Sequence, residues 1–197
     1  MQDVETFLAG LAQSRGLTQA ATRAGFVASP DLSLPHALEI ALDHRWLIQP
    51  VEALSESPPN SARIGVPSRE KEQIEYWFLN HPDANWLLEL GGPSGVVALR
   101  IELQLARYSL EYLAGDDTSW LRTLRFGVGN RWFALYQYLS GLPALAGLPG
   151  LRLLTRNSIL IPPARAPSGI ELAYANPHAQ LLPFPWQQQT ALPRFAL

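Results

Sequence analysis

The chain has 197 residues, of which 47% are hydrophobic and 16% charged, and its formal net charge is −2. This composition is sufficient for a packed core and excludes an intrinsically disordered chain, while the near-neutral charge predicts no general attraction to nucleic acid or to a membrane surface. The absence of cysteine excludes disulfides, thiolate metal ligands and a cysteine nucleophile, and it fits a cytoplasmic protein. No apolar run reaches the ~18 residues of a membrane span and no signal peptide is visible, so we expect no membrane association.

The first 32 residues are predicted to form a small helical N-terminal extension. Apolar residues recur there at intervals near 3.6, and Gly16 divides the pattern into two short helices. Residues 17–25 faintly resemble a helix-turn-helix. Short alanine-rich amphipathic helices produce the same pattern by chance, so we do not expect this segment to bind DNA.

The next third of the chain alternates helices and strands. A helix is predicted over 33–46, with Ser33 as its cap, and another opens at 68–71 with a capping-box-like start and ends at His81-Pro82. A polar loop with turn residues separates them. Apolar runs bounded by turn residues predict three strands, at 47–51, 85–90 and 96–102.

The remaining elements are shorter. An amphipathic helix is predicted over 103–114, followed by a hairpin whose arms are 120–126 and 131–138. Further extended segments are expected at 151–154, 158–161 and 170–174. Helices interspersed with strands and a hairpin favour an α+β domain with a mixed or antiparallel sheet over a doubly wound parallel one. We therefore expect this domain to span residues 33–185, with a C-terminal tail at 186–197.

One segment combines a turn, a strand and a charge pair. The glycine turn that begins at Gly91 leads into an apolar strand that ends in Arg100-Ile101-Glu102. Residues i and i+2 of a strand point to the same face, so Arg100 and Glu102 are expected side by side. Two carboxylates there would suggest a divalent-metal site. With an arginine in the first place, a self-paired strand end, an anion site and a rearranged metal site all stay open.

Several common sites are excluded or disfavoured. The four histidines have no pair at ligand spacing, so a zinc site is not expected. The single lysine, Lys71, follows no phosphate-binding glycine loop, and the glycines at 91–95 lack the dinucleotide-binding spacing. No Gly-x-Ser-x-Gly nucleophile elbow occurs.

The order of the remaining motifs resembles a known family. A tryptophan-containing helix ends in Pro82-Asp83-Ala84-Asn85, a Ser94-Gly95 turn leads a strand to the charged pair, and a glycine hairpin and Pro162-Pro163 follow. This order is similar to the N-terminal domain of the bifunctional DNA primase/polymerase (prim-pol) family, a branch of the archaeo-eukaryotic primase fold. The resemblance covers roughly residues 35–185.

This sequence differs from the family's pattern at the positions that bind metal and phosphate. The two aspartates that hold its divalent metals correspond to Arg100 and Glu102, and arginine, a cation without an acceptor, cannot bind Mg²⁺. The family's phosphate-contacting histidine corresponds to Arg131, the glycine before it to Asn130, and the serine after the paired prolines to Ala164. The resemblance thus implies Glu102 as the one remaining catalytic candidate, no metal or other cofactor, and an anion- or nucleotide-binding set of Arg100, Gly129, Asn130, Arg131 and Ser158.

Three functions are compatible with these residues. The leading expectation is a catalytically degenerate prim-pol-like domain, an accessory module in replication or in a mobile element. Its partners would be nucleotide, DNA or replication proteins supplied in trans. The first alternative is an active DNA primase/polymerase that uses Mg²⁺ or Mn²⁺ with Glu102 and a further acid such as Glu89 or Asp117. The second is a structural or protein-interaction domain without nucleotide binding. The sequence leaves the oligomeric state open.

Overall fold

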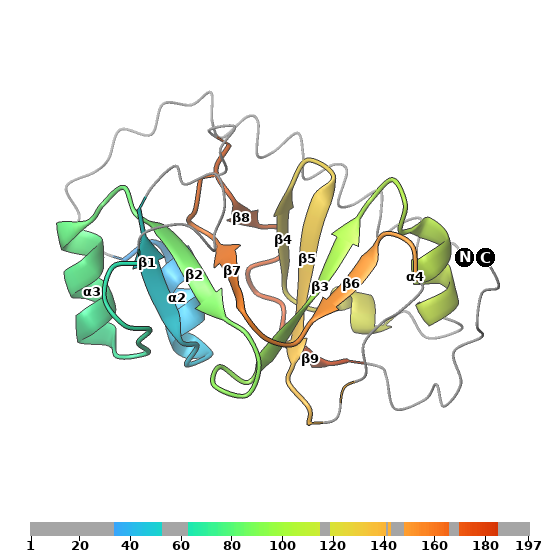
Figure 1. The fold of residues 1–197 in the computed structure, drawn as a ribbon, viewed down its shortest axis with the longest axis horizontal. Coiled ribbons are helices and arrows are strands. Elements are labelled where there is room, and N and C mark those ends of the chain that lie inside the picture. Colours follow the sequence, from blue (N-terminus) through green and yellow to red (C-terminus); the bar gives the residue numbers. More distant parts are fainter. Residues whose placement is uncertain are drawn as a thin grey trace.

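The computed structural model describes residues 34–52, 63–114, 119–140, 142, 148–165 and 170–184. The expected N-terminal extension at 1–32, with its helix-turn-helix-like segment, lies outside the described residues, as does the tail at 186–197. Within the described part, the domain is α+β, with antiparallel sheets flanked by a few helices (Figure 1). This confirms the fold class at that level.

The strands form two sheets. The smaller sheet has the order β1-β2-β7, and its antiparallel strands are β1 (Ile48–Val51), β2 (Asn85–Glu89) and β7 (Ser158–Ile161). The larger sheet has the order β6-β3-β5-β4-β8, with β6 (Leu151–Leu154), β3 (Val96–Glu102), β5 (Arg131–Gln137), β4 (Arg125–Val128) and β8 (Ala173–Tyr174). A short strand, β9 (Leu182–Pro183), pairs with β5 in parallel. The chain crosses between the sheets at the β2–β3 turn and again at the β6–β7 turn.

Helices lie at the two ends of the molecule. In Figure 1, α2 (His36–Asp43) and α3 (Lys71–Asn80) lie beside the smaller sheet, and α4 (Arg107–Ala114) lies at the opposite end, near β6. A 3₁₀ helix, η2 (Ser119–Arg122), precedes β4. Within the described part of the chain, no helix is long and apolar enough to cross a membrane.

Two apolar clusters cover the two faces of the larger sheet. Alternate residues of β3 (Val97, Leu99 and Ile101) pack with α4 and η2 in one cluster. The intervening residues Val96 and Ala98 belong to the second cluster, which also contains the apolar face of the smaller sheet and residues of α2 and α3. Both faces of β3 are thus buried through Leu99, and the strand emerges from this packing only at its last residues, where Arg100 and Glu102 stand.

The element predictions are right for β1, β2, β3, β6 and β7 to within a residue, and Pro162-Pro163 follows the end of β7 as expected. The helix predicted over 103–114 begins only at Arg107, and residues 103–105 form a turn in which the amides of Leu105 and Ala106 donate to the carbonyl of Glu102. The first hairpin arm is also shorter than predicted. Residues 119–122 are 3₁₀, which lets both Trp120 and Leu121 reach the core.

Two further boundaries differ from the predictions. The expected capping box at the start of α3 is absent: the Ser68 hydroxyl accepts from the amide of Glu70, and the helix begins at Lys71 without a side-chain cap. The extended segment expected over 170–174 pairs with β4 only at Ala173–Tyr174. Ser33, the expected cap of the earlier helix, lies outside the described residues, and Pro35 stands at the N-cap of α2.

Candidate anion-binding site

The end of β3 carries the charge pair that the sequence singled out. Arg100 and Glu102 share a face of the strand, and Nη2 of Arg100 donates to Oε1 of Glu102. Their side chains are 29% and 35% exposed, so the pair is half-buried at the edge of the core. The only carboxylate at the end of β3 is therefore neutralised by a cation on its own strand.

The strands on either side of β3 bring more charge to the same face. The register places Arg131 of β5 directly opposite Glu102, and Arg152 of β6 directly opposite Arg100. Directly opposite residues of an antiparallel pair share a face of the sheet. The charged sheet end, defined as Arg100, Glu102, Arg131 and Arg152, therefore combines three guanidinium groups with one carboxylate and carries a net charge of +2.

A small hollow lies beside this group at the β4–β5 turn. It has a volume of about 400 Å³ and is lined by Glu102, Gln104, Leu105, Asn130 and Arg131. The carbonyl of Asn130 accepts from the amide of Leu103 at 3.0 Å, which fixes the turn against the chain that leaves β3. Gly129 stands in the same turn with φ +60°. The side chain of Arg131 is exposed, and no residue in the described ranges forms an ion pair with it.

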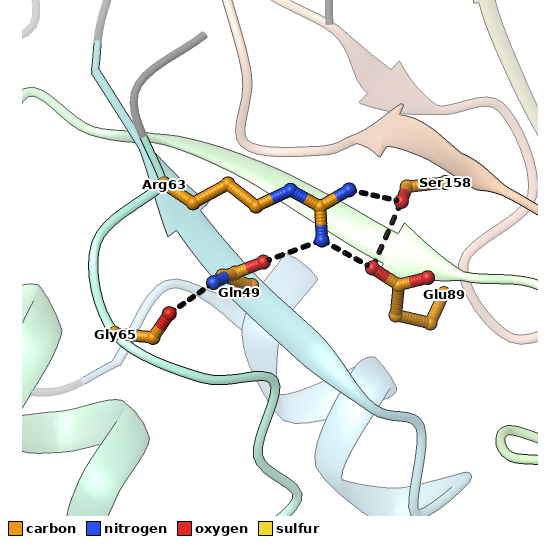
Figure 2. A network of polar contacts seen from close by, with 5 residues as sticks. All are labelled: Gln49, Arg63, Gly65, Glu89 and Ser158. Carbon is orange, nitrogen blue, oxygen red and sulfur yellow. Dashed lines mark hydrogen bonds and ion pairs between the residues drawn. The ribbon is translucent and has the colours of Figure 1, made fainter. Parts of the chain in front are cut away.

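Ser158, the remaining predicted anion ligand, lies in the smaller sheet. Figure 2 shows its hydroxyl donating to Oε1 of Glu89 (2.8 Å) and accepting from Nη2 of Arg63 (3.3 Å). Nη1 of Arg63 donates both to Glu89 and to Gln49, each at 3.1 Å, and the Gln49 amide donates to the carbonyl of Gly65. This network joins β1, β2 and β7, and within it the Ser158 hydroxyl is already paired with Glu89 and Arg63. Contacts among the described residues do not bring Ser158 to the charged sheet end, and its role as an anion ligand stays a prediction.

The arrangement of carboxylates bears on the metal hypothesis. Glu89, suggested as a second metal ligand, belongs to the smaller sheet and is ion-paired with Arg63. Asp117, the other suggestion, lies outside the described residues. Across the residues whose structure is described, no three His, Cys, Asp or Glu side chains come together as a metal site would require. Guanidinium groups, by contrast, match the geometry of phosphate and carboxylate groups, so the charged sheet end has the donor set of an anion site.

Comparison with models of known protein families and with curated proteins gave no match for this chain. The site is therefore interpreted from its own residues.

Sequence reasoning missed Arg152. Its strand was predicted, but local periodicity carries no information about which strand it pairs with, and Arg152 lies more than fifty residues beyond Arg100. The register of β6 on β3 supplies the missing relationship. A composition signal was nevertheless present: residues 118–197 contain seven arginines and one carboxylate, Glu171, a net charge of +6 in a chain whose total is −2. Positive charge concentrated in one segment of a chain is typical of anion-binding surfaces.

Proposed function

We propose that this chain is a catalytically degenerate prim-pol-like domain that binds nucleotide or nucleic-acid phosphate at the charged sheet end without a metal ion. The observation that carries the proposal is the ion pair between Arg100 and Glu102, at the positions where the resemblance places two metal-binding acids. Arg100 offers no oxygen to a metal ion, and its guanidinium group is already paired with the carboxylate of Glu102. The two additional arginines on the same face supply the positive charge that phosphate oxygens need.

An aromatic side chain supports nucleic acid as the ligand class. Phe133 lies directly opposite Arg100 on β5, on the same face, and its ring stacks on Phe126 with centroids 5.4 Å apart. Its side chain is half-buried, so part of it stays exposed beside Arg100. Guanidinium groups beside an aromatic ring are the usual components of single-strand binding surfaces, where phosphates pair with arginine and bases contact the ring.

A binding experiment tests the proposal. Fluorescence anisotropy of a labelled oligothymidine should show binding that weakens steeply with salt, because each phosphate contact releases counterions. Arg131→Ala should weaken binding about ten-fold at low salt and reduce the salt slope by about one unit. The matched control is Arg122→Ala on η2, whose neighbours Trp120 and Leu121 pack on the opposite face of the larger sheet. Equal effects of the two substitutions, or no binding at all, would contradict the proposal and favour a structural or protein-interaction domain.

A second experiment separates the degenerate domain from an active enzyme. Purified protein is incubated with primed template, deoxynucleotides and Mg²⁺ or Mn²⁺, and primer length is measured. We expect no extension, because Glu102 is paired with Arg100 rather than with a second acid. Template-dependent extension that disappears in Glu102→Ala would replace this proposal with an active primase/polymerase.

A further inference from the structure

A second and larger hollow lies where the two sheets meet, at the β2–β3 and β6–β7 turns. Its volume is about 900 Å³, within the range of small-molecule sites. The residues that line it come from three segments: Leu90–Pro93, Tyr138–Leu139 with Leu142, and Arg152–Asn157. Of the residues in the charged sheet end, only Arg152 reaches it. The two hollows are therefore different sites.

The walls of this hollow are tied together by backbone contacts. The amide of Leu90 donates to the carbonyl of Asn157 at 2.8 Å, and the amide of Tyr138 donates to the carbonyl of Gly95 at 2.8 Å. At Gly91 the β2–β3 turn approaches the β6–β7 turn so closely that a Cβ atom there would lie 2.7 Å from the carbonyl oxygen of Thr155. These contacts hold all three segments in a fixed relation, so the hollow is a formed part of the fold.

Charge defines one side of the hollow. Arg152 and Arg156 both line it, both are exposed, and neither has an ion-pair partner among the residues that the structure describes. Among the described residues that line it there is no carboxylate, and the sequence from 118 to 170 contains none. Thr155 lies between the two arginines in the sequence and Asn157 follows Arg156. Both add neutral hydrogen-bonding groups. This wall is complementary to a multiply charged anion such as a phosphate.

The other two lining segments are mostly apolar and include one ring. Tyr138 is 36% exposed, and its Cε1 atom lies near Gly92, at 3.7 Å from where a Cβ atom of that residue would be. Leu90, Pro93 and Leu139 continue the apolar lining. A ring beside a small residue leaves a flat surface on which a planar heterocycle can stack. An inorganic anion alone would leave this surface unused.

From these two walls we infer that the hollow is a nucleotide-binding pocket, in which Arg152 and Arg156 hold the phosphate and Tyr138 contacts the base. The inference is independent of the proposed function, because it rests on residues that the charged sheet end, apart from Arg152, does not contain. It places a monomeric nucleotide in this hollow, whereas the charged sheet end is proposed to bind nucleotide or nucleic-acid phosphate and is tested with an oligonucleotide.

Isothermal titration with AMP tests this pocket, with inorganic phosphate and adenosine as separate probes. We expect AMP to bind more tightly than either part alone. Arg156→Ala should weaken AMP binding about ten-fold, as loss of a charge-assisted contact does, and Arg122→Ala should leave it unchanged. Tyr138→Ala should weaken AMP but not phosphate. Unfolding temperatures of all variants establish that each is folded.

Two results would overturn the inference. The first is AMP affinity unchanged by both Arg156→Ala and Arg152→Ala, and the second is equal affinity for AMP and phosphate with no effect of Tyr138→Ala. Arg131→Ala distinguishes this pocket from the charged sheet end, because Arg131 lines the smaller hollow and not the larger one. Loss of oligothymidine binding in Arg131→Ala with AMP binding intact would leave the pocket standing. If AMP binding is lost only in Arg131→Ala, the pocket inference fails.

Discussion

Glu102 lies directly opposite Arg131 on the neighbouring strand, yet its carboxylate is paired with Arg100, two residues earlier on its own strand. The Arg100–Glu102 pair neutralises the half-buried carboxylate of Glu102 and leaves the exposed guanidinium of Arg131 without an ion pair among the described residues. The site therefore offers an unpaired cation to solvent, while the charge of its one acid is neutralised by Arg100. Such an arrangement favours an incoming anion over an incoming metal ion.

Substituting the acid is expected to strengthen anion binding. In Glu102→Gln the charged sheet end changes from a net charge of +2 to +3, and Arg100 loses its partner and becomes available to a ligand. We expect tighter oligothymidine binding and a salt dependence steeper by up to about one unit. Fluorescence anisotropy at several salt concentrations measures both. Weaker binding in this variant would mean that Glu102 itself contacts the ligand.

Two glycines of the β2–β3 turn provide a matched test of the backbone. Gly91 and Gly95 both have positive φ, at +97° and +65°. A Cβ atom at Gly91 would lie 2.7 Å from the Thr155 carbonyl oxygen, whereas a Cβ atom at Gly95 would have no described residue other than its chain neighbours within 4 Å. Gly95→Ala is expected to cost about 1 kcal/mol of the free energy of unfolding, from the left-handed conformation alone. Gly91→Ala should cost about 2–4 kcal/mol, because the backbone of the β6–β7 turn must also move. Urea denaturation measures the two values, and equal values would contradict the close approach at Gly91.

Much of this turn and its strands is readable from the sequence. The turn residues at 91–95 and the apolar run that follows predict β3 residue for residue, and period two places Arg100 and Glu102 on one face. The pairing of the strands, by contrast, could not be predicted from the sequence. Consecutive strands β6 and β7 belong to different sheets, so Arg152 joins Arg100 while Ser158 joins Glu89. Such pairings depend on packing between segments far apart in the chain, which local patterns do not encode.

The network in Figure 2 is expected to stabilise the smaller sheet. Glu89 is 22% exposed and accepts hydrogen bonds from Arg63 and Ser158. Glu89→Ala should lower the free energy of unfolding by about 1–2 kcal/mol, because two partners of a half-buried group are lost. Glu75→Ala serves as the control. It removes an exposed ion pair with Lys71, 3.6 Å long, which should contribute less than about 0.5 kcal/mol. Equal losses in the two variants would show that the network contributes no more than a surface ion pair.

Two tyrosines are expected to make the fold sensitive to alkali. Burial raises the pKa of Tyr136 well above its usual value, although nearby Arg125 acts in the opposite direction, and burial also raises the pKa of Tyr174. Because these phenols ionise at lower pH in the unfolded chain, the folded state loses stability as pH rises above about 10. Below that pH both states bind the proton and the contribution is constant. The loss should approach about 1.4 kcal/mol per pH unit for each buried phenol.

Phenylalanine variants check that assignment. Tyr136→Phe should flatten the decline in stability above pH 10, measured by urea denaturation at several pH values. At neutral pH it should be near neutral or stabilising by up to about 1 kcal/mol, since the buried hydroxyl has no hydrogen-bond partner among the described residues. Tyr108→Phe, at a side chain that is 81% exposed, is the control and should leave the alkaline decline unchanged. A decline that is the same in wild type and both variants would assign it to other groups.

Placing an acid at the first position of the charge pair tests whether Arg100 prevents metal binding at the end of β3. Arg100→Asp places two carboxylates on one face of β3, at positions i and i+2, and removes the cation that repels a metal. Without metal, the variant should be less stable than wild type, because the ion pair becomes a repulsion. Adding Mn²⁺ should then raise its unfolding temperature by about 2–4 °C for each kcal/mol of binding free energy, with no such rise in wild type. Arg122→Asp makes the same change of charge on η2 and controls for nonspecific metal binding; an equal Mn²⁺ effect in both variants would mean that the end of β3 has no geometry suited to a metal.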